Sequence, residues 1–400
     1  MRPELHYRHD NIDLALLRRR AYNYRWATLP PDVIALTAAD PDFPVADPIR
    51  DAVAGYAQSG LYCYGPHEGL PEFRASAARM LRTHRRFDAD PTRILPIDSA
   101  ASGMLVATRT LMSAGDEAII FDPVDYLFRT SVEAVGGVVR TLPNDPESGR
   151  PDWSALASLI TPRTRIIGVC NPVNPSGLVL REAELRQIGE LAVERGLWVL
   201  SDEIWSDIVY APRSFVSMAA LGAPIAGRVI TVYGLSKSFG LAGLRVGFIH
   251  APSADMYEKL VATSQVLTTA GGVSTIAQIA GTAAYDEARP WLEAFLTHLD
   301  EMRSLGVARL NAMPGVRCEA PEGTYLLFPR VEVPGMSSSE VAAFLLESGR
   351  VAVVPGSGKF FGPGAEGHLR ICFATSREIL TEGLDRIEGA LRQLQAGGSG

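Results

Sequence analysis

Short apolar runs alternate with amphipathic stretches through the middle of the chain. Strand-like runs occupy residues 117–122, 136–142, 164–170, 197–202, 228–234 and 245–250. Apolar residues at helical spacing predict helices between these runs, for example at residues 131–135 and 181–195. Because strand, helix and strand in succession typically build a parallel sheet covered by helices, this pattern predicts an α/β domain with a mostly parallel sheet.

The pattern changes towards the C-terminus. A long helical stretch at 291–311 is followed by the apolar run GTYLLFPRV, a helix at 338–348, the runs VAVVPG and HLRICFA, and a final helix. This mixture predicts a smaller α+β domain. We expect the N-terminal segment to join it, so that residues 46–289 form a large domain and residues 1–45 and 290–400 form a small one.

The composition is typical of a soluble globular protein. Hydrophobic residues make up 47% of the 400 residues, and the net charge of −7 with a pI near 5.6 argues against a nucleic-acid partner. The longest uncharged run, residues 261–285, is broken by Thr, Ser, Gln and Gly, which a bilayer core disfavours. We therefore expect no membrane contact.

Cysteine usage and the N-terminus bear on the cellular compartment. The first ten residues, MRPELHYRHD, lack the apolar stretch of a secretory signal. Cys63, Cys170, Cys318 and Cys372 stand apart without a CxxC pair, which predicts neither a disulfide framework nor a zinc site. The histidines have no metal-ligand spacing. We expect a cytoplasmic protein without a bound metal.

Lysine is rare in this chain. Only Lys237, Lys259 and Lys359 are lysines among the 38 basic residues. Arginine stays protonated and cannot act as an amine nucleophile, whereas a desolvated lysine can lose its proton and form a Schiff base. Lys237 lies among glycines and other small residues in GLSKSFGLAGLRVGF, while the other two are expected to be solvated. Lys237 is therefore the candidate for amine chemistry.

Polar residues follow three of the predicted strands. Asn171 and Asn174 come after the run at 164–170, Asp202 ends the run at 197–202, and Lys237 follows the run at 228–234. In open α/β sheets, ligands bind beyond the carboxyl ends of the strands, where such residues gather. The sequence therefore predicts one site that contains a lysine, a carboxylate and an amide.

Three motifs carry a resemblance to a known family. SKSFGLAGLRVGF, NPVNPSG and SDEIW, in their order and spacing here, resemble the fold-type I enzymes that use pyridoxal 5'-phosphate (PLP), the aspartate aminotransferase superfamily of class I/II aminotransferases. The resemblance covers almost the whole chain. It implies a large PLP-binding domain, a small domain, and a homodimer with shared active sites.

A narrower resemblance is carried by three further stretches. RRRAYNYRW at 18–26, AADPDF at 38–43 and SDEIWSD at 201–207 look most like the cystathionine β-lyase (C–S lyase) subgroup. Enzymes of that subgroup eliminate or replace substituents on the substrate side chain instead of transferring the amino group. This keeps elimination open as an alternative to transamination.

The resemblance implies a role for each polar residue at the strand ends. Lys237 is expected to hold PLP through a Schiff base and to move the proton at the substrate Cα. Asp202 is expected to pair with the pyridine nitrogen, although SDEIW would also suit a helix N-cap. Asn174 is expected to donate to the phenolic oxygen of the cofactor and to contact substrate, while Asn171 forms a turn.

Further positions match the cofactor phosphate and the substrate. Arg245 is expected to hold the phosphate, together with the small-residue turn that is formed by Ser99, Ala100 and Ala101 before a helix. Tyr64 matches a tyrosine that reaches the phosphate in the neighbouring subunit. The resemblance also implies that Arg370 binds the substrate α-carboxylate bidentately and that Ala39 contacts the substrate.

The chain departs from the family pattern at four positions. Gly234 and Ala101 replace residues whose hydroxyls usually bond the phosphate, and Trp205 stands where aminotransferases often have a tyrosine. Asp125, in DPVDYLF, falls where an aromatic residue stacks on the pyridine ring. Either Asp125 faces the ring, as a third titratable group that holds a substrate cation or moves a proton, or Asp125 points to solvent and Tyr126 stacks instead.

These observations predict a PLP-dependent enzyme that acts on an α-amino acid, with an aminotransferase as the first expectation. Elimination or replacement at the β or γ carbon is the alternative, and a PLP-binding regulator without catalysis is a third. The regulator is disfavoured because Lys237, Asp202 and Arg370 are all present and no DNA-binding segment is attached. The sequence does not name the amino acid.

Overall fold

The computed structural model describes residue 9 and residues 12–145, 148–268 and 270–397. Its centre is a seven-stranded sheet with the order β2-β8-β7-β6-β5-β3-β4. The strands are β2 (Ile94–Ile97), β3 (Glu117–Asp122), β4 (Val138–Pro143), β5 (Thr164–Cys170), β6 (Trp198–Asp202), β7 (Val229–Gly234) and β8 (Gly247–His250). Only β8 runs antiparallel to its neighbours, so the other strands of this sheet share one direction.

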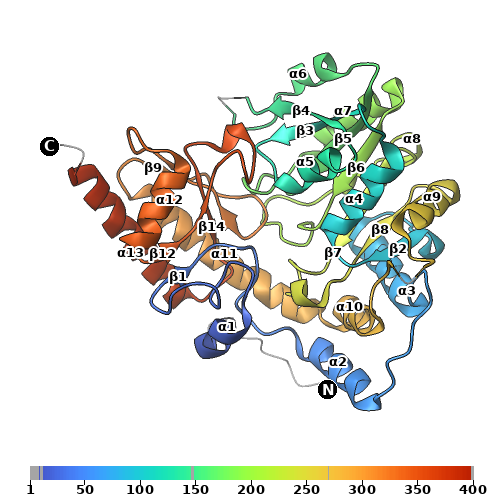
Figure 1. Cartoon of the computed structure of the whole chain (residues 1–400), viewed down its shortest axis with the longest axis horizontal. Helices are drawn as coiled ribbons and strands as arrows, with labels where there is room; N and C mark the ends of the chain where they lie inside the picture. Colours follow the sequence, from blue (N-terminus) through green and yellow to red (C-terminus); the bar gives the residue numbers. More distant parts are fainter. Residues whose placement is uncertain (1–8, 10–11, 146–147, 269, 398–400) are drawn as a thin grey trace.

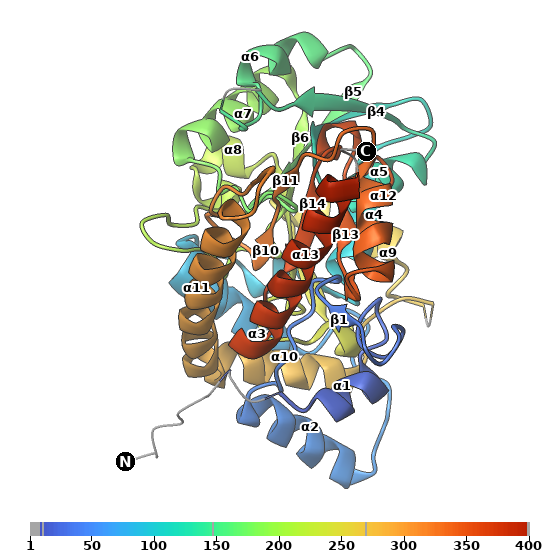
Figure 2. The ribbon, with the colours of Figure 1, turned by 90° about the vertical axis from the view of Figure 1, so that its left-hand side faces the viewer.

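Helices cover both faces of this sheet (Figures 1 and 2). On one face lie α4 (Ala100–Leu111), α5 (Tyr126–Glu133) and α9 (Ala254–Ser264), and on the other lie α7 (Glu182–Arg195) and α8 (Ala223–Ala226). A short helix, α6 (Trp153–Leu156), follows β4. The expected α/β class with a mostly parallel sheet between helices is confirmed.

The strand predictions agree closely with the structure, with one omission. All six predicted runs are strands, within about two residues at their ends. Strand β2 was not predicted, because ILPI is short, contains a proline and has no alternation; it pairs antiparallel with β8 at the edge of the sheet. The helix expected at 131–135 begins earlier, at Tyr126, because Asp125 caps its N-terminus.

The N-terminal and C-terminal parts of the chain meet in small sheets. Strand β1 (Ile34–Ala35) pairs parallel with β12 (Val351–Ala352). A second sheet has the order β10-β14-β13, from Leu326–Leu327, Leu369–Cys372 and Val354–Pro355, and β9 (Val316–Arg317) pairs with β11 (Arg330–Val331). Helices α11 (Arg289–Asn311), α12 (Ser338–Glu347) and α13 (Arg377–Gly397) pack around them. The domain boundaries at 45/46 and 289/290 stay a prediction.

A third group of helices lies beside the sheet edge that carries β2. Helix α10 (Thr275–Glu287) packs against α2 (Asp47–Ser59) and α3 (Pro71–Met80), and α1 (Leu14–Arg20) lies near the N-terminus. The connection between α2 and α3 has no helix or strand, and Leu61, Tyr62 and Tyr64 are exposed along it. Other described parts of the same subunit therefore leave these three large side chains exposed.

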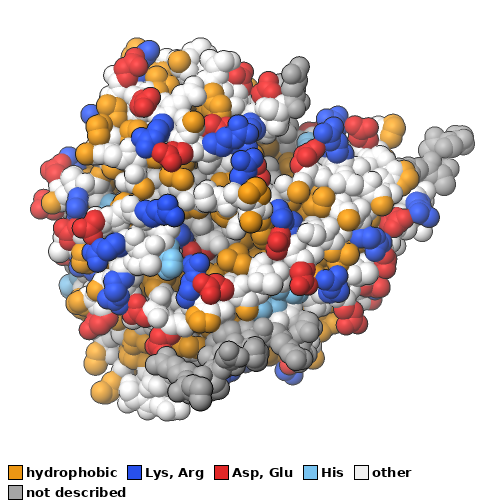
Figure 3. All heavy atoms as spheres, turned by 180° about the vertical axis from the view of Figure 1, so that it is seen from behind, with side chains coloured by type: hydrophobic (Ala, Val, Ile, Leu, Met, Phe, Trp, Pro, Cys, Tyr) orange, Lys and Arg blue, Asp and Glu red, His pale blue; other side chains and the backbone are white. Residues whose placement is uncertain are grey.

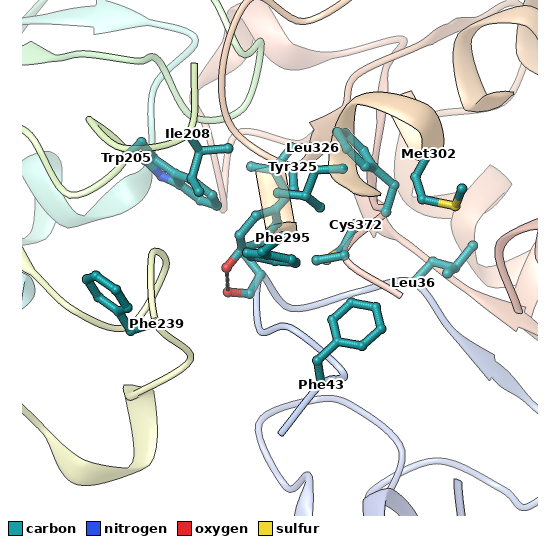
Figure 4. Packing of buried hydrophobic residues seen from close by; sticks show 14 of the residues in the cluster. Leu36, Phe43, Trp205, Ile208, Phe239, Phe295, Met302, Tyr325, Leu326 and Cys372 are labelled. Atoms are coloured by element: carbon teal, nitrogen blue, oxygen red, sulfur yellow. Dashed lines mark hydrogen bonds between the residues drawn. The ribbon is translucent and has the colours of Figure 1, made fainter. Parts of the chain in front are cut away.

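A shared apolar core holds these parts together. One cluster of buried residues combines Leu36 and Phe43 from the N-terminal segment with Trp205 from the central part and Phe295 from α11 (Figure 4). Trp205 lies edge-on against Tyr325, with ring centroids 4.6 Å apart. Because burial of large aromatic side chains is strongly stabilising, this cluster fixes the N-terminal and C-terminal segments over the carboxyl ends of β6 and β7.

The surface has no large field of one charge on the face in Figure 3, where acidic and basic side chains are interspersed. Of the helices in the described ranges, none combines the length and apolar character needed to cross a membrane. The expectation about a secretory signal concerns the first ten residues, which except for His9 lie outside the described residues.

Candidate active site

A cavity of about 440 Å³ lies beyond the carboxyl ends of β5, β6 and β7. Residues from the N-terminal segment and from the small sheets close it on the other side. Its lining includes every site residue expected from the sequence except Tyr64: Ala39, Ser99, Ala100, Ala101, Asp125, Tyr126, Asn174, Asp202, Trp205, Lys237, Arg245 and Arg370. The volume falls in the range typical of small-molecule sites.

The amine of Lys237 lies inside this cavity. Its Nζ donates a hydrogen bond to the carbonyl oxygen of Ala39 at 2.8 Å and lies 5.5 Å from the centre of the Trp205 ring. Burial lowers the pKa of Lys237, and the positive charge of Arg370 lowers it further, against the opposing effects of Asp40 and Asp125. A lowered pKa increases the share of the amine that is neutral and therefore nucleophilic.

Lys259 and Lys359 lie in different surroundings. Lys259 is exposed and forms an ion pair with Asp255 at 2.8 Å, one helical turn away. Lys359 is exposed beside Phe360. Neither ammonium lines the cavity.

The carboxylate of Asp202 ends strand β6 and is buried, with 5% exposure. It accepts one hydrogen bond, from the backbone N–H of Ile204 at 3.1 Å. Burial raises the pKa of Asp202 to about 7, and the charges of Asp125 and Glu203 add to the rise. Among the described residues, no basic side chain forms an ion pair with it, and a buried carboxylate of this kind is suited to a cation that arrives with a ligand.

The N-terminus of α4 forms another wall of the cavity. Ser99 caps this helix, its Oγ accepting from the N–H of Ser102 at 3.1 Å, and Ala100 and Ala101 form the first turn. Arg245, which is exposed, donates from Nη2 to Ser99 Oγ at 2.9 Å. A helix N-terminus with an adjacent guanidinium is a suitable site for a phosphate group.

Three side chains form a hydrogen-bonded chain across the cavity wall. Arg370 donates from Nη1 to Asn174 Oδ1 at 3.2 Å, and Asn174 donates from Nδ2 to Asp125 Oδ2 at 2.6 Å. The orientation of the Asn174 amide follows from its neighbours, because the opposite one would place oxygen against carboxylate and nitrogen against guanidinium. The three residues come from β14, the loop after β5 and the N-cap of α5.

Arg370 is buried and only partly satisfied. Its Nη2 reaches the carbonyl oxygen of Thr37 at 3.3 Å, and its Nε has no hydrogen-bond partner among the described residues. Burial lowers the pKa of Arg370, while Asp125 opposes that shift. A buried guanidinium with an unpaired N–H beside a cavity is suited to an anionic ligand group.

Asp125 and Tyr126 both line the cavity. Asp125 is half-buried, and Tyr126 begins α5 with 45% of its surface exposed. The Asp125 carboxylate also accepts from the N–H of Leu127 at 3.1 Å, as an N-cap. Burial raises the pKa of Asp125, against the effects of that N–H, Arg370 and Lys237.

The altered positions at Gly234 and Trp205 have packing explanations. A Cβ on Gly234 would approach Ile204 Cδ1 to 2.9 Å, so the Ile204 side chain occupies the space that a hydroxyl-bearing residue would need. Trp205 is buried between Lys237 and Tyr325. This part of the wall is therefore apolar, and Arg245, Ser99 and the helix N-terminus remain as phosphate donors.

Sequence reasoning missed several residues that shape the site. Tyr325 donates from its hydroxyl to the carbonyl oxygen of Ala39 at 3.0 Å, and Asp40 lines the cavity beside it. Arg25 bonds the carbonyl oxygen of Ala38 at 2.9 Å and forms a buried ion pair with Asp42. Ala39 and Tyr325 lie in the stretches AADPDF and GTYLLF. Their approach to Lys237 depends on contacts between distant parts of the chain, which the sequence pattern does not indicate.

The donor set fits PLP. Arg245 and the N–H groups at the start of α4 suit a phosphate, the buried carboxylate of Asp202 suits a protonated ring nitrogen, and Lys237 Nζ supplies an amine in the same cavity. Among the described residues, no group of three or more His, Cys, Asp or Glu side chains is placed to hold a metal ion.

Tyr64 is not part of this cavity. Its side chain is 91% exposed in the connection between α2 and α3. The structure contains one subunit, so the expected reach of Tyr64 into a neighbouring site stays a prediction.

Comparisons with known proteins agree on one family. A family described as aminotransferase class I and II matches residues 31–387. The chain is 35% identical over 366 residues to an aspartate aminotransferase of Pyrococcus abyssi, spanning 90% of this chain and 92% of that protein. The crystal structure of an aromatic aminotransferase from Pyrococcus horikoshii OT3 matches with a TM-score of 0.85 at 32% identity, over 92% of this chain and 97% of that one.

A second solved structure contains the cofactor. It is a PLP-bound candidate aminotransferase from Clostridium difficile 630, with a TM-score of 0.89 at 25% identity, over 96% of this chain and 100% of that one.

Proposed function

The chain belongs to the aminotransferase class I and II family and is a PLP-dependent enzyme, and we propose that the cavity around Lys237 is its active site. There it exchanges the amino group of an α-amino acid for the oxygen of a 2-oxo acid. One observation carries this proposal: the amine of Lys237, the carboxylate of Asp202 and the guanidinium of Arg370 line a single cavity.

The chemistry that PLP supplies when bound is a cationic conjugated ring, which accepts the electron pair left on the substrate Cα when its proton is removed. Asp202 keeps the ring nitrogen protonated, because a buried carboxylate gains a counter-ion only when that nitrogen is cationic. Ser99, the N–H groups at the start of α4 and Arg245 hold the phosphate. Asn174, with one N–H not used by Asp125, donates to the phenolic oxygen.

Lys237 performs two tasks in this proposal. Its Nζ would hold the cofactor covalently in the absence of substrate, and as a free amine it would move the proton at the substrate Cα. The lowered pKa of Lys237 supports the second task, because it increases the share of the neutral amine, which is the form that accepts a proton. Trp205 packs beside this amine and excludes water from it.

Arg370 orients the substrate. Its guanidinium is held by Asn174 and by the carbonyl of Thr37, and its Nε remains available for an α-carboxylate. A carboxylate held there places the Cα of the substrate near Lys237. Ala39 lies on the substrate side of Lys237, where its carbonyl oxygen holds the amine in the free protein.

We further propose a homodimer in the cytoplasm. The exposed row of Leu61, Tyr62 and Tyr64 is a surface that a second copy of the chain would cover, and Tyr64 would then reach the partner's phosphate site. Cys63, Cys170, Cys318 and Cys372 are all unpaired thiols, which supports a reducing compartment.

A product assay tests the proposed reaction. Purified enzyme with PLP is incubated with a panel of amino acids, and oxo-acid formation that depends on an added 2-oxo acid, pyruvate or 2-oxoglutarate, is measured beside release of ammonia or thiol. We expect the new oxo acid and the amino acid made from the acceptor in equal amounts with at least one of the two acceptors, and Lys237→Ala inactive as the control. Release of ammonia without a need for an added 2-oxo acid would instead support elimination, the alternative that the C–S lyase resemblance leaves open.

A further inference from the structure

The charges that line the cavity are not balanced once the proposed ligands are placed. Among the described lining residues the cations are Lys237, Arg245 and Arg370. In the proposed function, which this inference builds on, they serve the cofactor aldehyde, the phosphate and the substrate α-carboxylate. Of the lining carboxylates, Asp202 serves the ring nitrogen and Asp98 lies 3.8 Å from Arg245. Neither Asp40 nor Asp125 forms an ion pair with another described residue.

Asp125 is the better defined of the two. It receives hydrogen bonds from Asn174 and from the N–H of Leu127, both neutral donors. Among the described residues, no Lys, Arg or His nitrogen lies within 4.0 Å of an Asp125 carboxylate oxygen, the limit for an ion pair. Its pKa is raised because burial disfavours the charged form. A cation brought by a ligand would relieve that penalty.

The position of Asp125 is fixed relative to the expected substrate. Its backbone N–H donates to the carbonyl oxygen of Asn174 at 2.9 Å, and its carboxylate bonds the amide of the same residue. That amide in turn bonds Arg370, which binds the α-carboxylate in the proposed function. Asp125 is therefore separated from the carboxylate-binding group by a single side chain, and it lines the cavity that the substrate enters in the proposed function.

Asp40 adds negative charge on another wall. It follows Ala39, whose carbonyl oxygen accepts from Lys237, and it is half-buried in the cavity lining. Burial lowers the pKa of Lys237, and of the charged groups near this lysine Asp40 opposes that shift most strongly. The two carboxylates thus act on the same enclosed space.

An acidic side chain would be unfavourable in this space. A substrate carboxylate beyond Cα would find no uncommitted cation among the described lining residues and would meet the charges of Asp40 and Asp125, a like-charge contact that disfavours binding. A neutral side chain would leave Asp125 desolvated. An ammonium or guanidinium would make a charge-assisted hydrogen bond with it.

We propose that the active site selects an amino acid whose side chain ends in a cation, with Asp125 as its partner and Asp40 adding to the attraction. Aspartate is thereby disfavoured as a substrate, although relatives of the chain are named aspartate aminotransferases. Asp125 contacts the substrate in this proposal and determines specificity, while Lys237 carries out the proton transfer.

A matched substrate series tests the proposal on the unmodified enzyme. One amino acid at a time is added to the enzyme with PLP, and the rate at which the cofactor absorbance falls is measured. The rates with L-ornithine, L-lysine and L-arginine are compared with those with L-norvaline, L-norleucine and L-glutamate. We expect the cationic members to exceed their neutral analogues in kcat/KM by about 10- to 100-fold, as for a hydrogen bond between charged groups. Glutamate is expected to rank below norvaline.

A variant assigns the effect to the residue. Asp125→Asn keeps a residue that also caps helices, so α5 retains its N-cap. It should remove most of the preference for lysine over norleucine. Asp98→Asn removes the same charge from the phosphate end of the cavity and should leave that ratio unchanged. Lys237→Ala and the double variant Lys237→Ala/Asp125→Asn are titrated with lysine and with norleucine. Their dissociation constants should show the same loss of preference for lysine, in proteins that do not turn the substrate over.

The outcomes are separable from those of the proposed function. If no amino acid converts the cofactor, the proposed function fails. If neutral or acidic amino acids react as well as lysine and ornithine, or if Asp125→Asn keeps the lysine-to-norleucine ratio, transamination stands and this inference is overturned. Binding of lysine to the Lys237→Ala variant that is no tighter than binding of norleucine would also overturn it.

Discussion

The Nζ of Lys237 donates a hydrogen bond to the carbonyl oxygen of Ala39 at 2.8 Å, although the two residues are 198 positions apart in the chain. Ala39 belongs to the N-terminal segment, shortly after β1, and Tyr325 bonds the same oxygen from the C-terminal part. One carbonyl therefore connects all three parts of the chain that form the cavity. In the proposed function, Lys237 Nζ would hold the cofactor in place of this hydrogen bond.

Replacement of Arg370 by lysine should weaken binding of the substrate carboxylate. Lysine keeps the positive charge but loses the planar pair of donors, so KM should rise about 10- to 100-fold for both the amino acid and the oxo acid. Steady-state kinetics measure this effect. Arg330→Lys, on an exposed position of β11, is the matched control. An unchanged KM in Arg370→Lys would show that the carboxylate is bound elsewhere.

Asp202→Asn should slow removal of the Cα proton. Without a carboxylate the ring nitrogen loses its proton, and the ring then accepts electrons poorly, so exchange of Cα hydrogen with deuterated water should fall by several orders of magnitude. NMR of the amino acid measures the exchange. Near-parental exchange in this variant, with PLP bound, would mean that another group protonates the ring.

The pH dependence of stability gives a second test of Asp202, in protein from which PLP has been removed. Burial raises its pKa from 3.8 to about 7. The folded state therefore binds the proton of Asp202 more tightly than the unfolded state, so ionisation of Asp202 lowers the free energy of unfolding. This loss begins near pH 4 and reaches its full size above pH 7. Asp202→Asn removes a cost on the order of a few kcal/mol at high pH.

Thermal unfolding at about pH 5 and pH 8.5 measures that effect. The PLP-free variant should unfold at a higher temperature than the PLP-free parent at pH 8.5, with a smaller difference at pH 5. Asp51→Asn, at an exposed carboxylate, should show no such pH-dependent gain. A difference that is equal at both pH values would contradict the raised pKa.

Much of the fold could be predicted from the sequence because the central strands are short, apolar and buried. The polar residues at their ends, Asn174, Asp202 and Lys237, line one cavity for the same reason: parallel strands bring their carboxyl ends together. Strand β2 escaped prediction because four residues that include Pro96 have no periodic pattern.

The rest of the site depends on contacts that leave no periodic signal. Asp40 follows the two-residue strand β1, and Tyr325 directly precedes the two-residue strand β10. Only tertiary packing defines how such short strands pair. The inward orientation of Asp125 follows from its place as the N-cap of α5, a signal that the sequence contains in an aspartate just before the helix. The role of Tyr64 depends on a second subunit.

The proposed dimer predicts complementation between two inactive or weakened variants. Tyr64→Phe should lower PLP retention, because the partner's phosphate loses a hydrogen bond, and Tyr62→Phe serves as its control. A mixture of Tyr64→Phe with Lys237→Ala should recover activity, since each mixed dimer has one site with an intact lysine and an intact tyrosine. If subunits exchange and activity does not return, each subunit contains a complete site and the proposal is wrong.

The most direct test of the account is to identify which lysine holds the cofactor. The enzyme with PLP is reduced with borohydride, digested and mapped by mass spectrometry. The account predicts a pyridoxyl group on Lys237 and none on Lys259 or Lys359, and it predicts that Lys237→Ala retains some PLP without a covalent bond. A pyridoxyl group on Lys259 or Lys359, with Lys237 unmodified, would contradict it.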